Sequence, residues 1–70
     1  MSTASPHPIQ IAREAQGLSR EALAGKAGVS LRTIERAELW QVAPRRATLA
    51  VIALALGVDV AALAPEKVAA

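Results

Sequence analysis

The sequence lacks cysteine, phenylalanine and tyrosine, and its 70 residues include one histidine and one tryptophan. Without cysteine there is no disulfide framework and no thiolate metal site, and a single histidine cannot build a zinc site alone. The longest apolar run, residues 47–57, is far shorter than the about 20 residues that cross a bilayer. We therefore expect no cofactor, no metal and no membrane partner.

Other absences exclude further classes of protein. The N-terminus lacks the basic and then apolar segment of a secretory signal, so the expected location is cytoplasmic. The chain also lacks a carboxylate pair, a nucleophile–base pair or a metal cluster placed where a pocket could form. We therefore expect neither an enzyme nor a binding site for a small-molecule ligand.

The chain is short enough for one domain with a thin core, because a chain of this size buries only about 60% of its unfolded surface. Residues 1–7 are polar and contain proline, which predicts a flexible arm with His7 in solvent. Residues 8–64 form the predicted domain, and residues 65–70 a frayed tail. The sequence shows neither the alternation of strands nor a hairpin signal, so the expected fold is all-α.

Five helices are predicted from apolar spacing and from residues that start or stop helices. Their expected ranges are 8–16, 20–27, 31–38, about 46–56 and 60–63. Ser19, Ser30 and Asp59 can cap the second, third and fifth helices. The second and third helices meet at Gly28, where a left-handed backbone is cheapest. A short basic helix held by such a turn is a device for entering a DNA groove.

The fourth helix is apolar on nearly every side. Leu49, Ile52, Ala53 and Leu56 form a stripe that we expect to face the core. Val51 and Leu54 lie outside this stripe, so the helix has to be covered on more than one side. Together with Leu39, Trp40 and Val42 of the preceding loop, they can form an oligomer or partner surface. The alternative is local packing of this loop onto the fourth helix.

The net charge of +2 is modest, but six of the eight basic residues lie within residues 20–46. Three of the six acidic residues, Glu21, Glu35 and Glu38, lie there as well. A basic patch must therefore arise from the geometry of the fold. Charge alone is as compatible with an ordinary solvated surface as with a nucleic-acid partner.

The segment Ser19–Glu38 resembles the helix-turn-helix of the phage repressor and Cro-like family, also called the Xre family. That motif has a small residue, a glycine and a β-branched residue at positions that correspond here to Ala24, Gly28 and Ile34. The resemblance covers about Ile9–Leu63. It implies a compact five-helix, lambda-repressor-like DNA-binding domain. The function that it implies is a sequence-specific transcriptional regulator of double-stranded DNA, a homodimeric repressor associated with the nucleoid.

The resemblance also implies roles for individual side chains. Leu31, Arg32 and Arg36 lie at the positions that read base edges, where arginine suits guanine O6 and N7. Glu35 can accept from cytosine N4, although pairing with Arg32 or Arg36 is the favoured role. The alternative for both arginines is contact with phosphate or water alone. The expected phosphate contacts are Arg20, Ser30, Gln41, Arg45 and Arg46.

Two further features concern the end of the third helix. Arg13 and Glu38 match family positions that often pair, which predicts a structural ion pair. Trp40 stands where the family usually has glycine. A second hypothesis is a protein–protein interaction module on the same fold, which would use the Leu39–Val42 loop and the outer face of the fourth helix.

Overall fold

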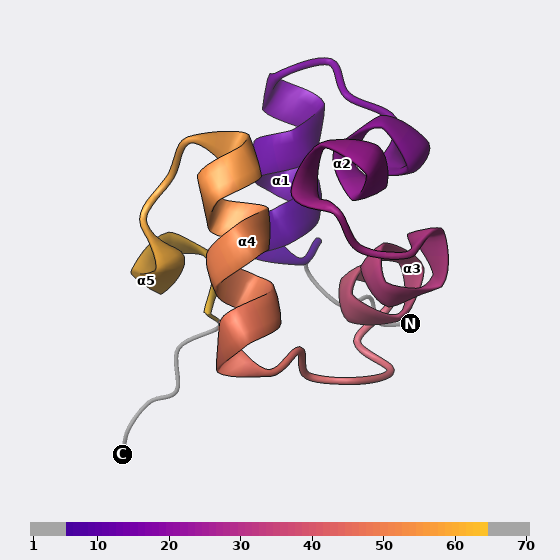
Figure 1. The fold of residues 1–70 in the computed structure, drawn as a ribbon, viewed down its shortest axis with the longest axis vertical. Helices are drawn as coiled ribbons and strands as arrows, with labels where there is room; N and C mark the ends of the chain where they lie inside the picture. The colour runs from indigo at the N-terminus through magenta and orange to yellow at the C-terminus, as the bar shows by residue number, and fades with distance from the viewer. Residues whose placement is uncertain (1–5, 65–70) are drawn as a thin grey trace.

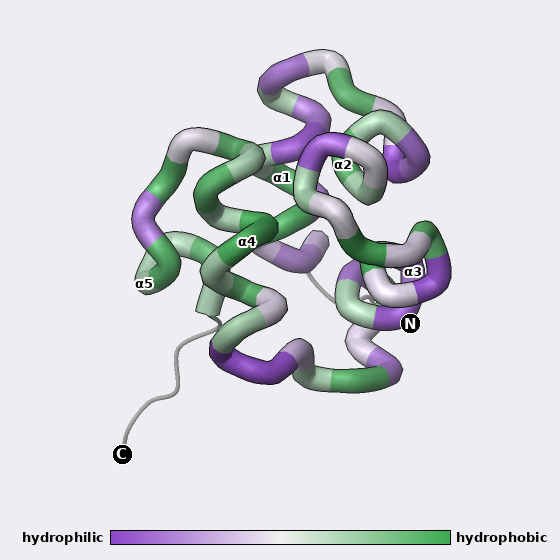
Figure 2. The backbone as a smooth tube through the Cα atoms, in the orientation of Figure 1, coloured by the Kyte–Doolittle hydropathy of each residue, from purple (hydrophilic) through white to green (hydrophobic). Residues whose placement is uncertain are grey.

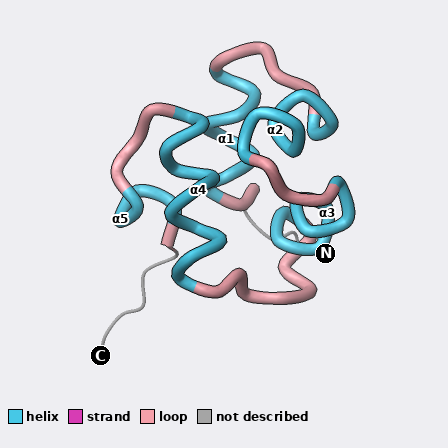
Figure 3. The backbone as a smooth tube through the Cα atoms, viewed as in Figure 1, coloured by secondary structure: helices cyan, strands magenta, loops and turns pink. Residues whose placement is uncertain are grey.

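The computed structural model describes residues 6–64, and these residues form five helices (Figure 1). They are α1 (Pro8–Ala15), α2 (Arg20–Ala27), α3 (Leu31–Glu38), α4 (Arg46–Leu56) and α5 (Val60–Leu63). Within this part of the chain there is no strand (Figure 3). The all-α, five-helix prediction is confirmed, and only α1 ends one residue earlier than expected, with Gln16 as its C-cap.

Polar side chains cap the start of α2, α3 and α5, as the sequence predicts. The backbone N–H of Ala22 donates to Ser19 Oγ at 2.9 Å, and that of Thr33 donates to Ser30 Oγ at 3.1 Å. Asp59 Oδ1 accepts from the N–H of Ala61 in the same way. Each bond satisfies a donor that the first turn of a helix leaves without a partner.

His7 caps α1, which the sequence analysis missed. Its Nδ1 accepts from the N–H of Ile9 at 3.0 Å, and the residue is 2% exposed. The prediction of a solvated His7 is therefore wrong, because the ring is both a helix cap and a packed group. Residues 1–5 of the predicted arm and the predicted frayed tail, residues 65–70, lie outside the described residues.

Four helices end on a residue with left-handed backbone. After α1, α2 and α4 this residue is glycine, with φ between 71° and 75°, whereas after α3 it is Trp40, with φ 63°. Trp40 N–H donates to the carbonyl of Ala37, and Gln41 N–H donates to that of Arg36 at 2.8 Å. These two bonds close the end of α3 in the pattern that usually has glycine at this position. A left-handed non-glycine residue costs roughly 1–2 kcal/mol.

The core lies between α4 and the other helices. Its five largest fully buried side chains come from all five helices and are Ile9, Leu23, Ile34, Ile52 and Leu63. Ala24 is 5% exposed at the approach of α2 to its neighbours, where a larger side chain would push them apart. Gln16 Nε2 donates to the carbonyl of Leu56 at 2.6 Å and joins the ends of α1 and α4.

The inner stripe of α4 is placed as predicted, but its outer side is not covered. Ile52, Ala53 and Leu56 are buried, and Leu49 packs against them. Val51 and Leu54 are 39% and 82% exposed. Figure 2 shows that α4 is green along most of its length, whereas the chain just before it is purple. The second cover that the sequence requires is therefore not supplied by residues 6–64.

Two further observations concern sites that the sequence argues against. Among the described residues, no helix combines the length and the apolar character needed to cross a membrane. Within the same residues, no group of three or more histidine, aspartate or glutamate side chains is gathered as a metal site would require.

Candidate nucleic-acid interface

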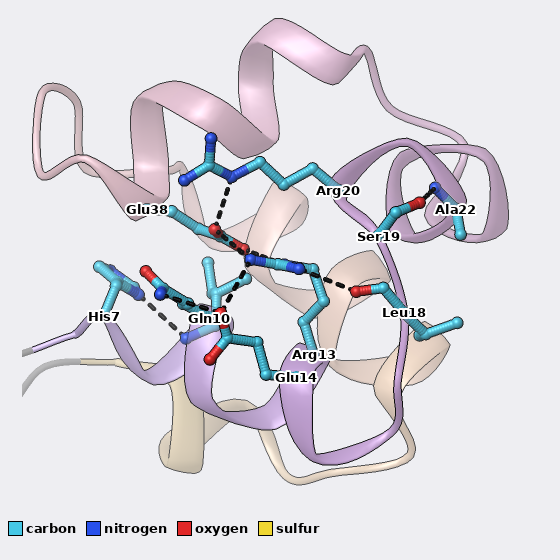
Figure 4. A network of polar contacts seen from close by, with 10 residues as sticks. His7, Gln10, Arg13, Glu14, Leu18, Ser19, Arg20, Ala22 and Glu38 are labelled. Atoms are coloured by element: carbon cyan, nitrogen blue, oxygen red, sulfur yellow. Dashed lines mark hydrogen bonds and ion pairs between the residues drawn. The ribbon is translucent and has the colours of Figure 1, made fainter.

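Glu38, at the end of α3, is the centre of a buried ion network (Figure 4). Arg13 Nε donates to Oε2 at 2.7 Å, and Arg13 Nη2 donates to Oε1 at 3.0 Å. Arg20 Nε donates to Oε1 at 2.9 Å. Arg13 Nη1 also donates to the carbonyl of Leu18 at 2.8 Å. We call Arg13, Arg20 and Glu38 the Glu38 network, and it ties α1, α2 and α3 together.

The Glu38 network is charged at neutral pH. Burial raises the pKa of Glu38, but hydrogen bonds and charge from Arg13 and Arg20 outweigh it and leave the pKa below 4.5. The hydrogen bond to Glu38 raises the pKa of Arg13 against the opposing effect of burial. Arg13 and Glu38 lie together as predicted, and their side chains are 10% and 0% exposed. The sequence analysis missed Arg20 as a partner of Glu38.

The inward position of Glu38 leaves α3 with basic side chains on its exposed side. Ile34, Ala37 and Glu38 are buried, whereas Arg32 and Arg36 are exposed. Leu31 and Glu35 are half-buried. Among residues 6–64, Glu35 forms no ion pair with Arg32 or Arg36, so the structure does not bring together the predicted steering pair. Both guanidinium groups are therefore available to a ligand.

The residues expected at phosphates lie in two different environments. Ser30, Gln41, Arg45 and Arg46 are exposed, at the start of α3, in the loop that follows it and at the start of α4. Ser30 Oγ also lies 2.8 Å from Thr33 Oγ1, and its cap fixes the N-terminus of α3. Arg20 differs because its Nε is bonded to Glu38, while its side chain is 35% exposed. Arg20 is thus a member of the Glu38 network with one edge in solvent.

The loop between α3 and α4, residues 39–45, packs against the N-terminal end of the domain. The rings of His7 and Trp40 have centroids 4.5 Å apart and are inclined at 49°. An apolar groove beside them is lined also by Val42, Pro44 and Leu49. Trp40 is 46% exposed, so it is neither a core residue nor a fully free anchor. Leu39 and Val42 are exposed to a similar degree.

His7 packs against Trp40 in addition to capping α1, and sequence reasoning missed this second role. Burial lowers the pKa of His7, and the negative charge of Glu38 opposes this effect only in part. The one available signal was a polar residue directly before Pro8, at the position of an N-cap. Nothing local to His7 indicates a partner 33 positions along the chain, at Trp40.

Comparison with known proteins agrees with this geometry. A family model described as helix-turn-helix, HTH_3, matches residues 9–63. A search of curated proteins and a search of solved structures gave no match. The matched range contains all of α2 and α3, the turn between them and the Glu38 network. The chain therefore belongs to the HTH_3 family of helix-turn-helix domains, the Xre/Cro/C1 type, whose members are DNA-binding domains and not enzymes.

Proposed function

We propose that this chain is a sequence-specific transcriptional repressor that binds double-stranded DNA as a homodimer, with α3 in the major groove. The observation that supports it most is the separation of charge around α3. Glu38 is turned inward onto Arg13 and Arg20, while Arg32 and Arg36 are exposed and without an ion pair among residues 6–64. A DNA-binding helix needs basic groups that no neighbouring carboxylate neutralises.

Base recognition is assigned to four residues of α3. Arg32 and Arg36 offer planar pairs of donors that match O6 and N7 of guanine. Leu31, at the start of α3, suits contact with a thymine methyl group, and Glu35 suits acceptance from cytosine N4. Both are half-buried, which holds their side chains in fewer conformations than those of the exposed arginines.

Phosphate contacts are assigned to residues on both sides of α3. Ser30 caps α3, and the N–H groups at this helix N-terminus would favour contact with a phosphate anion. Gln41, Arg45 and Arg46 are exposed on the loop and at the start of α4. Arg20 would contribute the part of its guanidinium that Glu38 does not use. These groups would set the register of α3 on the duplex without reading its sequence.

The experiment that tests this proposal is selection of bound DNA from a random pool, followed by binding of the Arg36→Ala variant. The variant is expected to lose about 1–3 kcal/mol on the selected site and much less on random DNA, because one guanine contact is removed. Lys26→Ala is the matched control, since Lys26 is exposed but lies on α2. An equal loss on both DNAs would show that Arg36 only neutralises phosphate.

The homodimer is supported by the uncovered side of α4. Leu54 and Val51 are exposed on a helix that carries no charge between Arg46 and its end. A two-fold dimer would place the two α3 helices on half-sites about 34 Å apart. Sedimentation of the chain and of Leu54→Glu tests it. We expect the dimer to dissociate in the variant while helicity is kept, and dimerisation of both proteins alike would exclude this face.

A second candidate function is a protein-interaction module, and the exposed apolar side chains of the α3–α4 loop favour it. Leu39, Trp40 and Val42 are 53%, 46% and 43% exposed. A salt titration of binding to mixed genomic fragments separates the two functions. Steep weakening with salt indicates a DNA reader, whereas no binding even at low salt indicates the interaction module.

A further inference from the structure

Among residues 6–64, the rings of His7 and Trp40 bring the N-terminal end of the domain into contact with the segment that follows α3. We propose that His7 is a positioning residue for DNA binding. Its neutral ring holds Trp40, and through Trp40 the α3–α4 loop that carries Gln41 and leads to Arg45 and Arg46, and protonation of His7 releases this hold. The inference rests on the proposed function, because the loop is assigned there to DNA phosphates.

The hydrogen bond of His7 defines its protonation state in the folded chain. Nδ1 accepts from the N–H of Ile9 at 3.0 Å, so this nitrogen carries no proton and the ring is neutral. A protonated imidazole has two donors and no acceptor, and it cannot cap α1 in this way. It would also place a charge on a residue that is 2% exposed. Protonation therefore removes the reasons for the ring to stay in its place.

On the other side of the contact, Trp40 holds a conformation that needs support. Its φ of 63° is left-handed, and the three other helix ends with such a residue use glycine. Strained backbone of this kind persists where the surroundings over-determine it. The amides of Trp40 and Gln41 close the end of α3 by donating to Ala37 and Arg36. A change at the Trp40 ring is therefore transmitted to both the end of α3 and the loop.

Among residues 6–64, one charged group, Glu38, acts on the pKa of His7. Glu38, on α3, is the charged group that acts on His7 from the packed helices, and it favours the protonated form. Its charge is shared with Arg13 and Arg20 in the Glu38 network. The residues of the loop and of α4 that line the groove beside His7 are uncharged. Burial outweighs Glu38, so the pKa of His7 lies below its ordinary value of 6.5.

The expected direction of the effect differs from simple electrostatics. At neutral pH His7 is uncharged and the loop is held, and the hold is lost as the pH falls through the lowered pKa of this ring. An added positive charge alone would strengthen DNA binding. Weaker binding in mild acid would therefore report release of the loop and not charge. His7 is the sole histidine of the chain, so no other imidazole contributes.

Two substitutions separate the contributions of the ring, the cap and the charge. His7→Phe keeps an aromatic ring against Trp40 but cannot be protonated and cannot cap α1. His7→Asn keeps a side-chain acceptor for the cap but has neither ring nor titration. The fluorescence of Trp40, the sole tryptophan, reports the contact directly. Circular dichroism at each pH establishes that every protein compared is folded.

We expect the fluorescence of the wild-type chain to titrate below pH 6.5 and that of both variants to stay constant in this range. Affinity for the selected DNA site should fall at least about fivefold from pH 7.5 to the pH at which the fluorescence change is complete in the wild type, at the low end of usual coupling between sites. His7→Phe should bind as the wild type does at pH 7.5 and keep that affinity at the lower pH. His7→Asn should bind weakly at both.

Each failure has a distinct meaning. If His7→Phe and the wild type weaken equally on acidification, or if fluorescence still titrates in the variants, the role of His7 is overturned and the proposed function stands. If the wild type selects no DNA site at pH 7.5, the proposed function fails, and the role of His7 in DNA binding fails with it. In that case the fluorescence titration still decides whether protonation breaks the His7–Trp40 contact.

Discussion

At the scale of single residues, Glu38 links three helices through its contacts with Arg13 and Arg20. Its carboxylate has no exposure and accepts hydrogen bonds from two arginines that lie 25 and 18 positions away in the chain. The charge of this group costs free energy to bury and is retained because both oxygens are bonded. The same arrangement removes an acid from the exposed side of α3.

Removing one partner of this pair should be severe. Arg13→Ala is expected to destabilise the fold by about 3–5 kcal/mol, because it leaves the Glu38 carboxylate buried without its main partner. At about 0.05–0.15 kcal/mol per residue, the total stability of a 70-residue domain is roughly 4–10 kcal/mol, so this loss is a large part of it. Arg20→Ala is the matched comparison and should lose about 1 kcal/mol, since this side chain is 35% exposed. Urea unfolding measures both, and equal losses would contradict the assignment.

At Trp40, the free-energy cost of the left-handed backbone can be measured separately from the contribution of the ring. Trp40→Ala and Trp40→Gly both lose the indole, but only glycine adopts the left-handed backbone without a steric penalty. Trp40→Gly should therefore be more stable than Trp40→Ala by about 1–2 kcal/mol in denaturant unfolding. Two variants of equal stability would mean that the α3 end rearranges once the ring is gone.

At the scale of elements, α3 depends on Ser30 for its start and on Trp40 and Gln41 for its end. An eight-residue helix is not stable alone in water, so its caps and its buried face must hold it. The buried face is small, with Ile34 and Ala37 beside Glu38. The helical conformation of α3, which we propose reads DNA, thus depends on contacts at its two ends.

Ser30 variants separate capping from DNA contact. Ser30→Ala removes the acceptor for the Thr33 N–H and should cost about 1 kcal/mol of stability. Ser30→Asp keeps a capping acceptor and places a favourable charge at the helix N-terminus, so it should be as stable as the wild type. Its charge should repel phosphate and weaken binding to any DNA sequence. Unchanged DNA affinity in Ser30→Asp would remove Ser30 from the interface.

At the scale of the whole molecule, two buried ionisable groups make the fold sensitive to acid. The pKa of His7 is lowered by burial, so its contribution is complete above pH 6.5 and is lost as the pH falls through the range below. The pKa of Glu38 is lowered despite burial by its two arginines, so its contribution is complete above pH 4.5 and is lost below that. Protonation of either group destabilises the fold, so both groups lower its stability as the pH falls.

Thermal unfolding across pH should therefore show two stages of loss. The melting temperature of the wild type should fall first just below pH 6.5 and again below pH 4.5. His7→Asn lacks the titrating group and should show the second stage alone. A first stage that persists in His7→Asn would mean that another group causes it.

Much of this fold follows from signals that act within four residues. The caps at Ser19 and Ser30 predict where α2 and α3 begin, because each side chain accepts a hydrogen bond from an amide three residues ahead. The spacing of Leu23, Ala24 and Ile34 predicts which faces become core. The family match over residues 9–63 confirms the same reading of the helix-turn-helix.

The candidate site was less predictable, because contacts between residues far apart in the sequence decide which charged side chains form ion pairs and which stay exposed. Nothing near Arg20 in the sequence distinguishes it from Arg32, yet one is bonded to Glu38 and the other is exposed. His7 reads as an arm residue until α3 brings Trp40 against it. The outer side of α4 shows the reverse case. There the sequence predicts a cover, and the described residues do not provide one.

Caps, turns and apolar spacing are local properties, so the helices, their order and the class of domain can be predicted from the amino-acid sequence. Which basic side chains stay exposed and which support the fold depends on how the helices pack together. Ion pairs and ring contacts form between residues 18 to 33 positions apart, where sequence spacing carries no information on distance. Glu38 and Trp40, two residues apart at the end of α3, both take their roles from such long-range contacts.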